Sequence, residues 1–250
     1  MIRLILVAVF LILFLIVSIP IFAVEWIIMK FNRPLAERSG FVIVQWALRV
    51  IGILAGARIT VIGHENIPTE RAVLYVGNHR SFFDIVVSVP LYVSLTGLVA
   101  KESLMKIPLF GIWMKRIGCL ALDREDPREA LKVIQQATEQ VRSGHSMAIY
   151  PEGTRNKHPE NGLMEFKEGS LRIAEKSGCP IVPVALVNTE QIFEAHFPWI
   201  RSTNIIIEFA PPIYVDQLSR QQKKGLGKQC QNIIQEIVDR NTAVLKDNGI

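Results

Sequence analysis

A histidine and an aspartate lie five positions apart in the segment NHRSFFD, residues 78–84. The segment follows a short apolar run that is typical of a strand. A turn between the two residues would bring His79 and Asp84 together, whereas a helix would keep them on different faces. A carboxylate that accepts from one imidazole nitrogen leaves the other nitrogen as a general base. The alternative is a loop histidine beside an aspartate that caps a helix, and the pair alone does not decide between the two interpretations.

A second polar segment, YPEGTRN at residues 150–156, also follows an apolar run. It places a carboxylate, a glycine, a hydroxyl and a guanidinium in succession: Glu152, Gly153, Thr154 and Arg155. The glycine permits close backbone approach, and the guanidinium is a planar fork suited to bidentate phosphate binding. Since ligands gather at the carboxyl ends of strands in α/β sheets, we expect both segments to face one crevice. A surface turn would explain the proline and the glycine, but not the arginine beside them.

Two further cations follow predicted strands. Lys101 comes directly after one apolar run, and Arg124 comes just after another. Together with Arg155, up to three cations could converge on an anionic group. Taken one at a time, each is more typical of a solvated surface charge.

Strands alternate with helices from about residue 57 onward, which predicts a layered α/β domain. The expected strands are 58–62, 72–76, 95–100, 118–122, 146–150, 181–187 and 204–209. The expected helices are 126–144, 167–177 and about 225–245. Asp126 is placed to cap the first of these helices, with Glu129 in position for a capping box.

The first 56 residues are more apolar than the α/β domain that follows them. Residues 4–24 are uncharged and apolar, long enough to cross a hydrocarbon core of about 30 Å and longer than the apolar part of a cleaved signal peptide. Residues 41–56 predict a second apolar helix with one polar stripe, formed by Gln45, Arg49, Gly52 and Gly56. This stripe would pack on the first helix or face lipid headgroups.

We therefore expect a two-helix membrane anchor over residues 1–56, followed by a catalytic domain over residues 57–250. The sequence does not distinguish helices that span the bilayer from a hairpin embedded in one leaflet. Lys30, Arg33 and Arg38 outnumber Arg3, so the loop after the first helix, and the catalytic domain with it, is expected on the cytoplasmic face.

Charge and composition narrow the class of partner. Lys and Arg number 28 against 23 Asp and Glu, and the resulting charge of +5 favours anionic partners such as phosphates and acidic lipids. Nucleic acid is not expected, because the basic residues are scattered and no nucleic-acid-binding motif occurs. The three cysteines form no CxxC, the histidines lack metal-ligand spacing, and so no metal is expected.

The polar segments resemble the conserved blocks of a known family. NHRSFFD resembles the NHxSxxD block of the glycerolipid acyltransferases, whose signature is HxxxxD, and YPEGTRN is similar to their EGTR block. GCLALDR resembles the intervening block that ends in arginine, and IVPVAL resembles the fourth block, centred on proline. GHENIP and FKEGSLRIA also resemble segments of 1-acyl-glycerol-3-phosphate acyltransferases. The four blocks occur in family order, and the resemblance covers about residues 57–210.

This resemblance implies a layered mixed sheet flanked by helices, preceded by a membrane-embedded helical segment. It also implies transfer of a fatty acyl group from acyl-CoA or acyl-ACP to the 2-hydroxyl of lysophosphatidic acid, which forms phosphatidic acid in phospholipid biosynthesis. The acyl thioester is then a co-substrate, no cofactor is implied, and the partners are the lysolipid, membrane lipids and, with an ACP donor, acyl carrier protein.

The resemblance also gives the motif residues roles. His79 would take the hydroxyl proton and Asp84 would stabilise the imidazolium, while donors near Gly153 and Thr154 would stabilise the oxyanion. The cations Lys101, Arg124 and Arg155 would hold the acceptor phosphate, with Glu152 orienting an arginine or a hydroxyl.

Other activities stay open at this point. Within the family, the acceptor could be another lysophospholipid or glycerol phosphate. A noncatalytic lipid-binding module would keep the cations but would not require His79. A lipid phosphate phosphatase would need a nucleophile or metal carboxylates that the sequence does not assemble.

Overall fold

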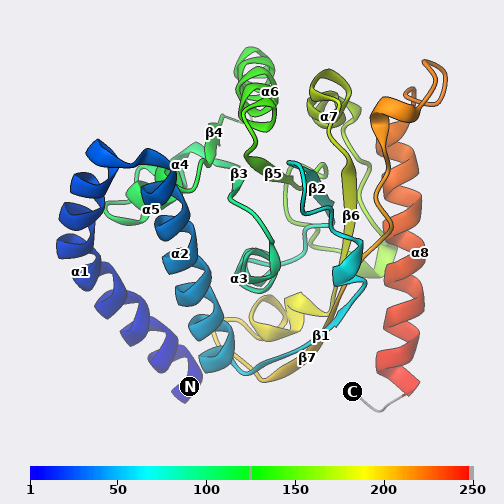
Figure 1. The fold of residues 1–250 in the computed structure, drawn as a ribbon. Helices are drawn as coiled ribbons and strands as arrows, with labels where there is room; N and C mark the ends of the chain where they lie inside the picture. Colours follow the sequence, from blue (N-terminus) through cyan, green and yellow to red (C-terminus); the bar gives the residue numbers. More distant parts are fainter. Residues whose placement is uncertain (124–125, 248–250) are drawn as a thin grey trace.

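The computed structural model describes residues 1–123 and 126–247, and within them one mixed sheet runs through the centre of the molecule (Figure 1). Its seven strands lie in the order β1-β7-β6-β2-β5-β3-β4. Their bounds are β1 Ala57–Ile62, β2 Leu74–Gly77, β3 Thr96–Lys101, β4 Leu120–Leu122, β5 Ser146–Ile149, β6 Ile181–Val187 and β7 Thr203–Phe209. All neighbouring strands are parallel except β6 and β7, which are antiparallel. The expected layered mixed sheet is confirmed, and each expected strand is present, with its ends shifted by at most two residues.

Helices cover both faces of the sheet. Their bounds are α1 Ile2–Phe31, α2 Arg33–Ala55, α3 Phe83–Ser88, α4 Glu102–Met105, α5 Phe110–Arg116, α6 Pro127–Arg142, α7 Arg172–Ser177 and α8 Leu226–Asp247. The Asp126 side chain caps α6 by accepting from the N–H of Arg128, while Glu129 accepts from Lys132. The helix expected over 167–177 begins instead as a 3₁₀ turn, Glu168–Leu171, before α7.

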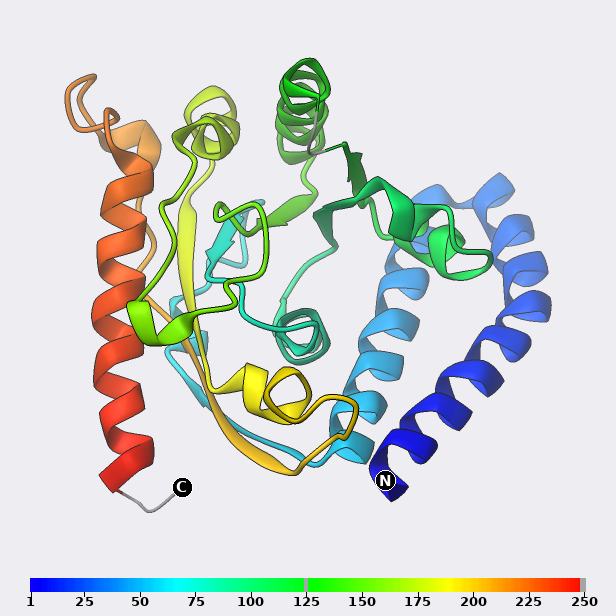
Figure 2. The same ribbon diagram turned by 180° about the vertical axis from the view of Figure 1, so that it is seen from behind.

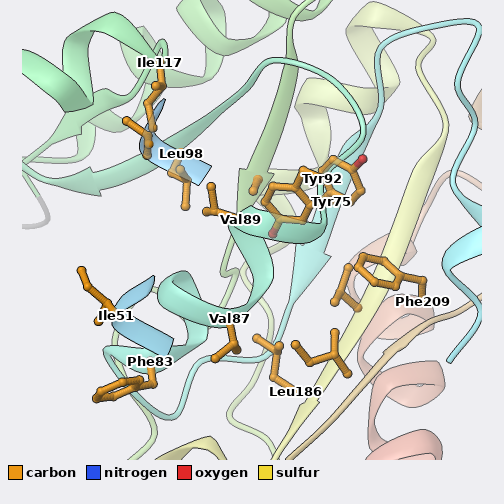
Figure 3. Packing of buried hydrophobic residues seen from close by; sticks show 14 of the residues in the cluster. Ile51, Tyr75, Phe83, Val87, Val89, Tyr92, Leu98, Ile117, Leu186 and Phe209 are labelled. Atoms are coloured by element: carbon orange, nitrogen blue, oxygen red, sulfur yellow. The ribbon is translucent and has the colours of Figure 1, made fainter. Parts of the chain in front are cut away.

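Two hydrophobic cores lie on opposite faces of the sheet. Side chains alternate between faces along a strand, so β6 contributes Val182, Val184 and Leu186 to one core and Ile181, Ala185 and Val187 to the other. All seven residues of β6 are buried, as expected for a strand covered on both faces. Figure 3 shows the first core, where the rings of Tyr75 and Tyr92 stack with centroids 4.1 Å apart.

The two N-terminal helices form a hairpin at one end of the molecule, with α2 between α1 and the sheet domain and α8 at the opposite end (Figures 1 and 2). Both helices are long and apolar enough to cross a membrane. Most large apolar side chains of α1 are exposed. Two polar contacts join α1 to α5: Trp113 Nε1 donates to Ser18 Oγ at 2.8 Å, and Arg116 Nη1 lies 3.3 Å from Glu25 Oε2.

The polar stripe of α2 contacts the sheet domain through Gln45 and Arg49, which was not expected, whereas Gly56 at its end lies beside Arg3 of α1. Gln45 Nε2 donates to the carbonyl oxygens of Val89 and Tyr92, at 3.0 and 2.9 Å. Arg49 donates to the carbonyl of Pro90 at 3.4 Å. These carbonyl groups lie in and just after the short 3₁₀ helix Val89–Leu91, which follows α3. The stripe is needed there because backbone carbonyl groups at such a helix require donors from a neighbouring element.

Candidate active site

The candidate site begins where β2 ends. Asn78 continues the pairing with β6 through its side chain: Nδ2 donates to the carbonyl of Leu186 at 2.9 Å, and Oδ1 accepts from the Leu186 N–H at 2.8 Å. The amide of this buried side chain therefore replaces a backbone pair at the point where the chain turns away from the sheet. That turn brings His79 and Asp84 together.

His79 and Asp84 form a hydrogen-bonded pair. Nδ1 of His79 lies 2.7 Å from Oδ2 of Asp84, in the first turn of α3. The carboxylate is fully buried, whereas 14% of the imidazole is exposed. An ionised carboxylate is an acceptor only, so the proton of the pair sits on Nδ1 and the lone pair of Nε2 is available as a base.

Further donors fix the orientation of the Asp84 carboxylate. Oδ2 also accepts from the N–H groups of Arg80 and Ser81, at 2.7 and 2.8 Å. Oδ1 accepts from Thr189 Oγ1 at 2.5 Å. With Nδ1 of His79, these donors make four hydrogen bonds to the carboxylate and fix its position.

The imidazole stacks on Tyr150, with ring centroids 4.6 Å apart. Burial raises the pKa of the Tyr150 phenol well above its ordinary value, so the ring stays neutral. Gly77 makes room for it, because a Cβ at that position would lie 3.1 Å from Tyr150 Cε1. One face of the histidine ring is therefore held by a neutral aromatic surface.

The two polar segments meet, as expected from their positions after neighbouring strands β2 and β5. Oε1 of the buried Glu152 accepts from the His79 N–H at 2.6 Å, and Oε2 accepts from the Met164 N–H at 3.1 Å. The Asn156 N–H donates to the His79 carbonyl at 2.7 Å. Burial is the largest influence on the Glu152 carboxyl and raises its pKa. Glu152 thus holds backbone N–H groups, and not the arginine or hydroxyl expected from the sequence.

The other residues of the EGTR segment differ in their surroundings. Gly153 has a φ of 74°, in the region that favours glycine, and its N–H donates to the carbonyl of Tyr150. Thr154 is exposed. Arg155 is partly buried, with Nη1 3.0 Å from Oε1 of Glu194 and the guanidinium 3.7 Å from the centroid of the Phe82 ring.

The remaining expected cations do not join this cluster in the described part of the chain. Lys101 is exposed at the end of β3 and makes no hydrogen bond or ion pair with the described residues of either segment. Arg124 lies outside the described residues. Within residues 1–123 and 126–247, no group of three His, Cys, Asp or Glu side chains is arranged to hold a metal ion.

Sequence reasoning missed the segment that follows β6, which contains the 3₁₀ helices Thr189–Ile192 and Glu194–His196. Thr189 donates a hydrogen bond to Asp84, and Glu194 accepts one from Arg155. Glu190 Oε1 lies 3.9 Å from Nη1 of the buried Arg80. The available signal was a polar run after a buried strand, the same signal that located the other two segments.

Comparisons with known proteins agree with this arrangement. Residues 58–187 match the family described as Acyltransferase. A 1-acyl-sn-glycerol-3-phosphate acyltransferase from Borreliella burgdorferi is 32% identical over 189 residues, which are 76% of this chain and 75% of that protein. An enzyme of the same name from Brassica napus (BAT2, chloroplastic) is 34% identical over 66% of this chain and 47% of its own length. The enzyme of that name from Escherichia coli is 30% identical over 65% of each chain.

The fold also matches a solved structure. The crystal structure of the 1-acyl-sn-glycerophosphate (LPA) acyltransferase from Thermotoga maritima superposes with a TM-score of 0.78, covering 97% of both chains at 24% sequence identity. At this identity the likeness shows the fold.

Proposed function

Because this chain belongs to the acyltransferase family, we propose that it transfers a fatty acyl group from an acyl thioester to the 2-hydroxyl of 1-acyl-glycerol-3-phosphate, forming phosphatidic acid. The names of its relatives support this acceptor. The observation that carries the proposal is the His79–Asp84 pair, hydrogen-bonded at 2.7 Å and joined to the EGTR segment through Glu152. An activated imidazole beside a phosphate-binding guanidinium suits a hydroxyl acceptor that carries a phosphate.

In the proposed reaction, Nε2 of His79 takes the proton of the acceptor hydroxyl as its oxygen attacks the thioester carbonyl. The tetrahedral intermediate then collapses, the carbon–sulfur bond breaks, and the imidazolium returns the proton to the leaving thiolate. Asp84 stabilises the imidazolium through Nδ1. No covalent acyl-enzyme is required, because the acceptor oxygen itself is the nucleophile.

Two donors were expected for the oxyanion, near Gly153 and Thr154. The Gly153 N–H is bonded to Tyr150, so Thr154, whose side chain is exposed, is the better candidate of the two. Arg155 binds the acceptor phosphate in this proposal, together with Lys101 and Arg124 if they approach when substrate is bound.

The substrates and the apolar helices favour a membrane location. A lysolipid and its product both reside in lipid, and the exposed apolar side chains of α1 are suited to contact with acyl chains. We further propose that residues 1–56 anchor the protein, that residues 57–250 form the catalytic domain on the cytoplasmic face, and that the donor is acyl-CoA or acyl-ACP.

A radiolabelled acyl thioester assay against a panel of lysolipids tests the proposed function. We expect labelled phosphatidic acid from lysophosphatidic acid, at a higher kcat/KM than any product from other lysophospholipids or from glycerol phosphate. Comparing CoA and ACP thioesters in the same assay identifies the donor. A preference for another acceptor would overturn the proposed substrate, and lysolipid binding without transfer to any acceptor would indicate a noncatalytic module.

A further inference from the structure

An acidic side chain is held at the edge of the candidate site by donors from both polar segments. Oε1 of Glu194 accepts from the Phe82 N–H at 2.8 Å and from Arg155 Nη1 at 3.0 Å. Oε2 accepts from Ser81 Oγ at 2.6 Å. A backbone N–H, a hydroxyl and a guanidinium thus converge on one carboxylate, and this donor set is also suited to a phosphate group.

We propose that Glu194 occupies the position of the acceptor's phosphate, and that a phosphate monoester displaces it when the acceptor binds. This inference rests on the proposed function and adds a residue that competes with the acceptor's phosphate for its donors. A phosphate monoester carries a charge of about −1.5 to −2 at pH 7 and three strong acceptor oxygens, against one charge and two oxygens for a carboxylate. It can give Ser81, Phe82 and Arg155 one oxygen each, whereas Glu194 divides two oxygens among them.

The position of this donor set relative to the base fits a short acceptor. Ser81 connects the two sites: its N–H donates to Asp84 Oδ2 and its hydroxyl donates to Glu194. Ser81 is also only two residues from His79. In a 1-acyl-glycerol-3-phosphate, two carbons and one ester oxygen separate the reacting 2-oxygen from the phosphorus. We therefore expect a headgroup of that size to span His79 and the three donors.

The segment that carries Glu194 is fixed to the core at both of its ends. Ile192 and Ile200 are both buried at its two ends, and the Arg201 N–H closes the base by donating to the Ile192 carbonyl at 2.9 Å. Between these anchors Phe193 packs against the first core, whereas the chain beyond Glu194 lies mostly on the surface, and 74% of Phe197 is exposed. Because short surface loops of this kind open at small free-energy cost, Glu194 can leave its three donors while Ile192 and Ile200 stay in place.

Displacement of Glu194 weakens the binding of every acceptor that takes its place. An acceptor with a phosphate replaces the hydrogen bonds that Glu194 gives up, whereas an acceptor without one leaves Arg155 and Ser81 unpaired. The three donors therefore discriminate against neutral acceptors, and Glu194 competes with the phosphate. Removal of Glu194 should strengthen phosphate binding.

The test compares Glu194→Gln and Glu194→Ala with the wild-type protein, using a short-chain monomeric lysophosphatidic acid at saturating acyl thioester. We expect KM for the acceptor to fall about 5- to 30-fold in Glu194→Ala, the factor that one to two kcal/mol implies, and by less in the isosteric Glu194→Gln. The inhibition constant of inorganic phosphate, as a competitor of the acceptor, should fall in parallel. Glu236→Gln, which removes an exposed charge on α8, is the matched control and should leave both constants unchanged.

The inference would be overturned if both Glu194 variants unfolded at the wild-type temperature and neither the KM nor the inhibition constant fell. An increase in these constants would show that Glu194 orients Arg155 for binding. Failure of the proposed function would give different results. The wild-type protein would then not acylate lysophosphatidic acid, or Arg155→Ala would leave the KM for lysophosphatidic acid unchanged.

Discussion

Thr189 donates a hydrogen bond to the buried carboxylate of Asp84, with Oγ1 2.5 Å from Oδ1. The two residues are 105 positions apart, and the contact forms because β6, which precedes Thr189, pairs with β2, which precedes the turn containing His79. The hydroxyl binds the carboxylate oxygen that His79 does not use. Thr189 therefore helps to set the orientation of the candidate dyad without contact with the imidazole.

Replacing Thr189 with valine should lower kcat about 10-fold with little change in KM for either substrate. The variant keeps the shape of the side chain but leaves Asp84 Oδ1 without its hydroxyl donor, a loss of about 1–3 kcal/mol for a buried charged acceptor. Thr189→Ser restores the hydroxyl and should recover most of the rate. Steady-state kinetics of the three proteins provide the measurement, and equal kcat in wild type and Thr189→Val would show that Asp84 does not need this contact.

Replacing His79 with alanine should abolish measurable turnover while the protein stays folded, because general-base catalysis typically contributes about 10²- to 10⁴-fold. Asp84→Asn should lower both activity and stability, since an amide cannot accept all the donors that converge on this carboxylate. His158→Ala, which removes an exposed imidazole, serves as the control and should retain full activity. Full activity of a folded His79→Ala protein would exclude the general-base mechanism.

Local patterns in the sequence predicted much of the fold. The strand expected over 181–187 coincides with β6, because a continuous apolar run bounded by turn residues is typical of a strand buried on both faces. The meeting of His79 with Glu152 was also predictable, since both side chains follow strands of one sheet and carboxyl ends of parallel strands share an edge.

The contributions of Thr189 and Glu194 could not be predicted in the same way. They depend on the order of strands in the sheet, which places β6 beside β2, and strand order is not encoded in any local pattern. The partner of the α2 stripe could not be predicted either. Gln45 donates to the carbonyl groups of Val89 and Tyr92, which are distant in sequence, so hydrophobic periodicity located the stripe but not its partner.

Polar substitutions on the outer face of α1 should weaken membrane binding. Leu6, Leu13 and Val17 are exposed on one side of the helix, and burial of each apolar side chain contributes about 1.5–3 kcal/mol. Changing all three to glutamine should reduce binding to anionic phospholipid vesicles about 10²-fold or more, measured by co-sedimentation. These substitutions are preferable to deletion of residues 1–56, because the deletion would also remove Phe41 of α2, which lies in the first core.

A matched control is available on α6, where Leu131 is exposed to a similar degree. Leu131→Gln should leave vesicle binding unchanged. If the α1 variant sedimented with vesicles as strongly as the wild-type protein, another surface would have to be responsible for membrane binding.

Arg155→Ala should penalise acceptors that carry a phosphate. A charge-assisted hydrogen bond to phosphate contributes about 1.5–3 kcal/mol, so we expect kcat/KM for lysophosphatidic acid to fall roughly 10- to 150-fold, with little further loss for an acceptor without phosphate. Arg155→Lys should recover only part, because an ammonium lacks the planar fork. Arg172→Ala, at an exposed arginine on α7, is the control. An increase in KM for the acyl thioester alone would assign Arg155 to the donor instead.

The stability of the protein should depend on pH through Glu190, whose carboxylate lies beside the buried Arg80. Burial is the largest influence on this carboxyl and raises its pKa above the ordinary value of 4.5; Arg80 acts in the opposite direction. Between 4.5 and the higher pKa of the folded state, the folded protein binds more protons at Glu190 than the unfolded chain does. The contribution of Glu190 to stability is therefore greatest at acidic pH and falls as pH rises through this window.

Glu190→Gln removes this titration, so the difference in unfolding free energy between variant and wild type should change with pH. At about pH 4 Glu190 is mostly protonated and resembles glutamine, so the two proteins should have similar stability. As pH rises to about 8, the wild-type protein should lose stability relative to the variant. Urea unfolding at a series of pH values gives the difference directly. Some dependence should persist in the variant, because burial also raises the pKa of Glu152. Glu236→Gln should show no such trend, and a constant difference for Glu190→Gln would mean that Glu190 titrates alike in the folded and unfolded states.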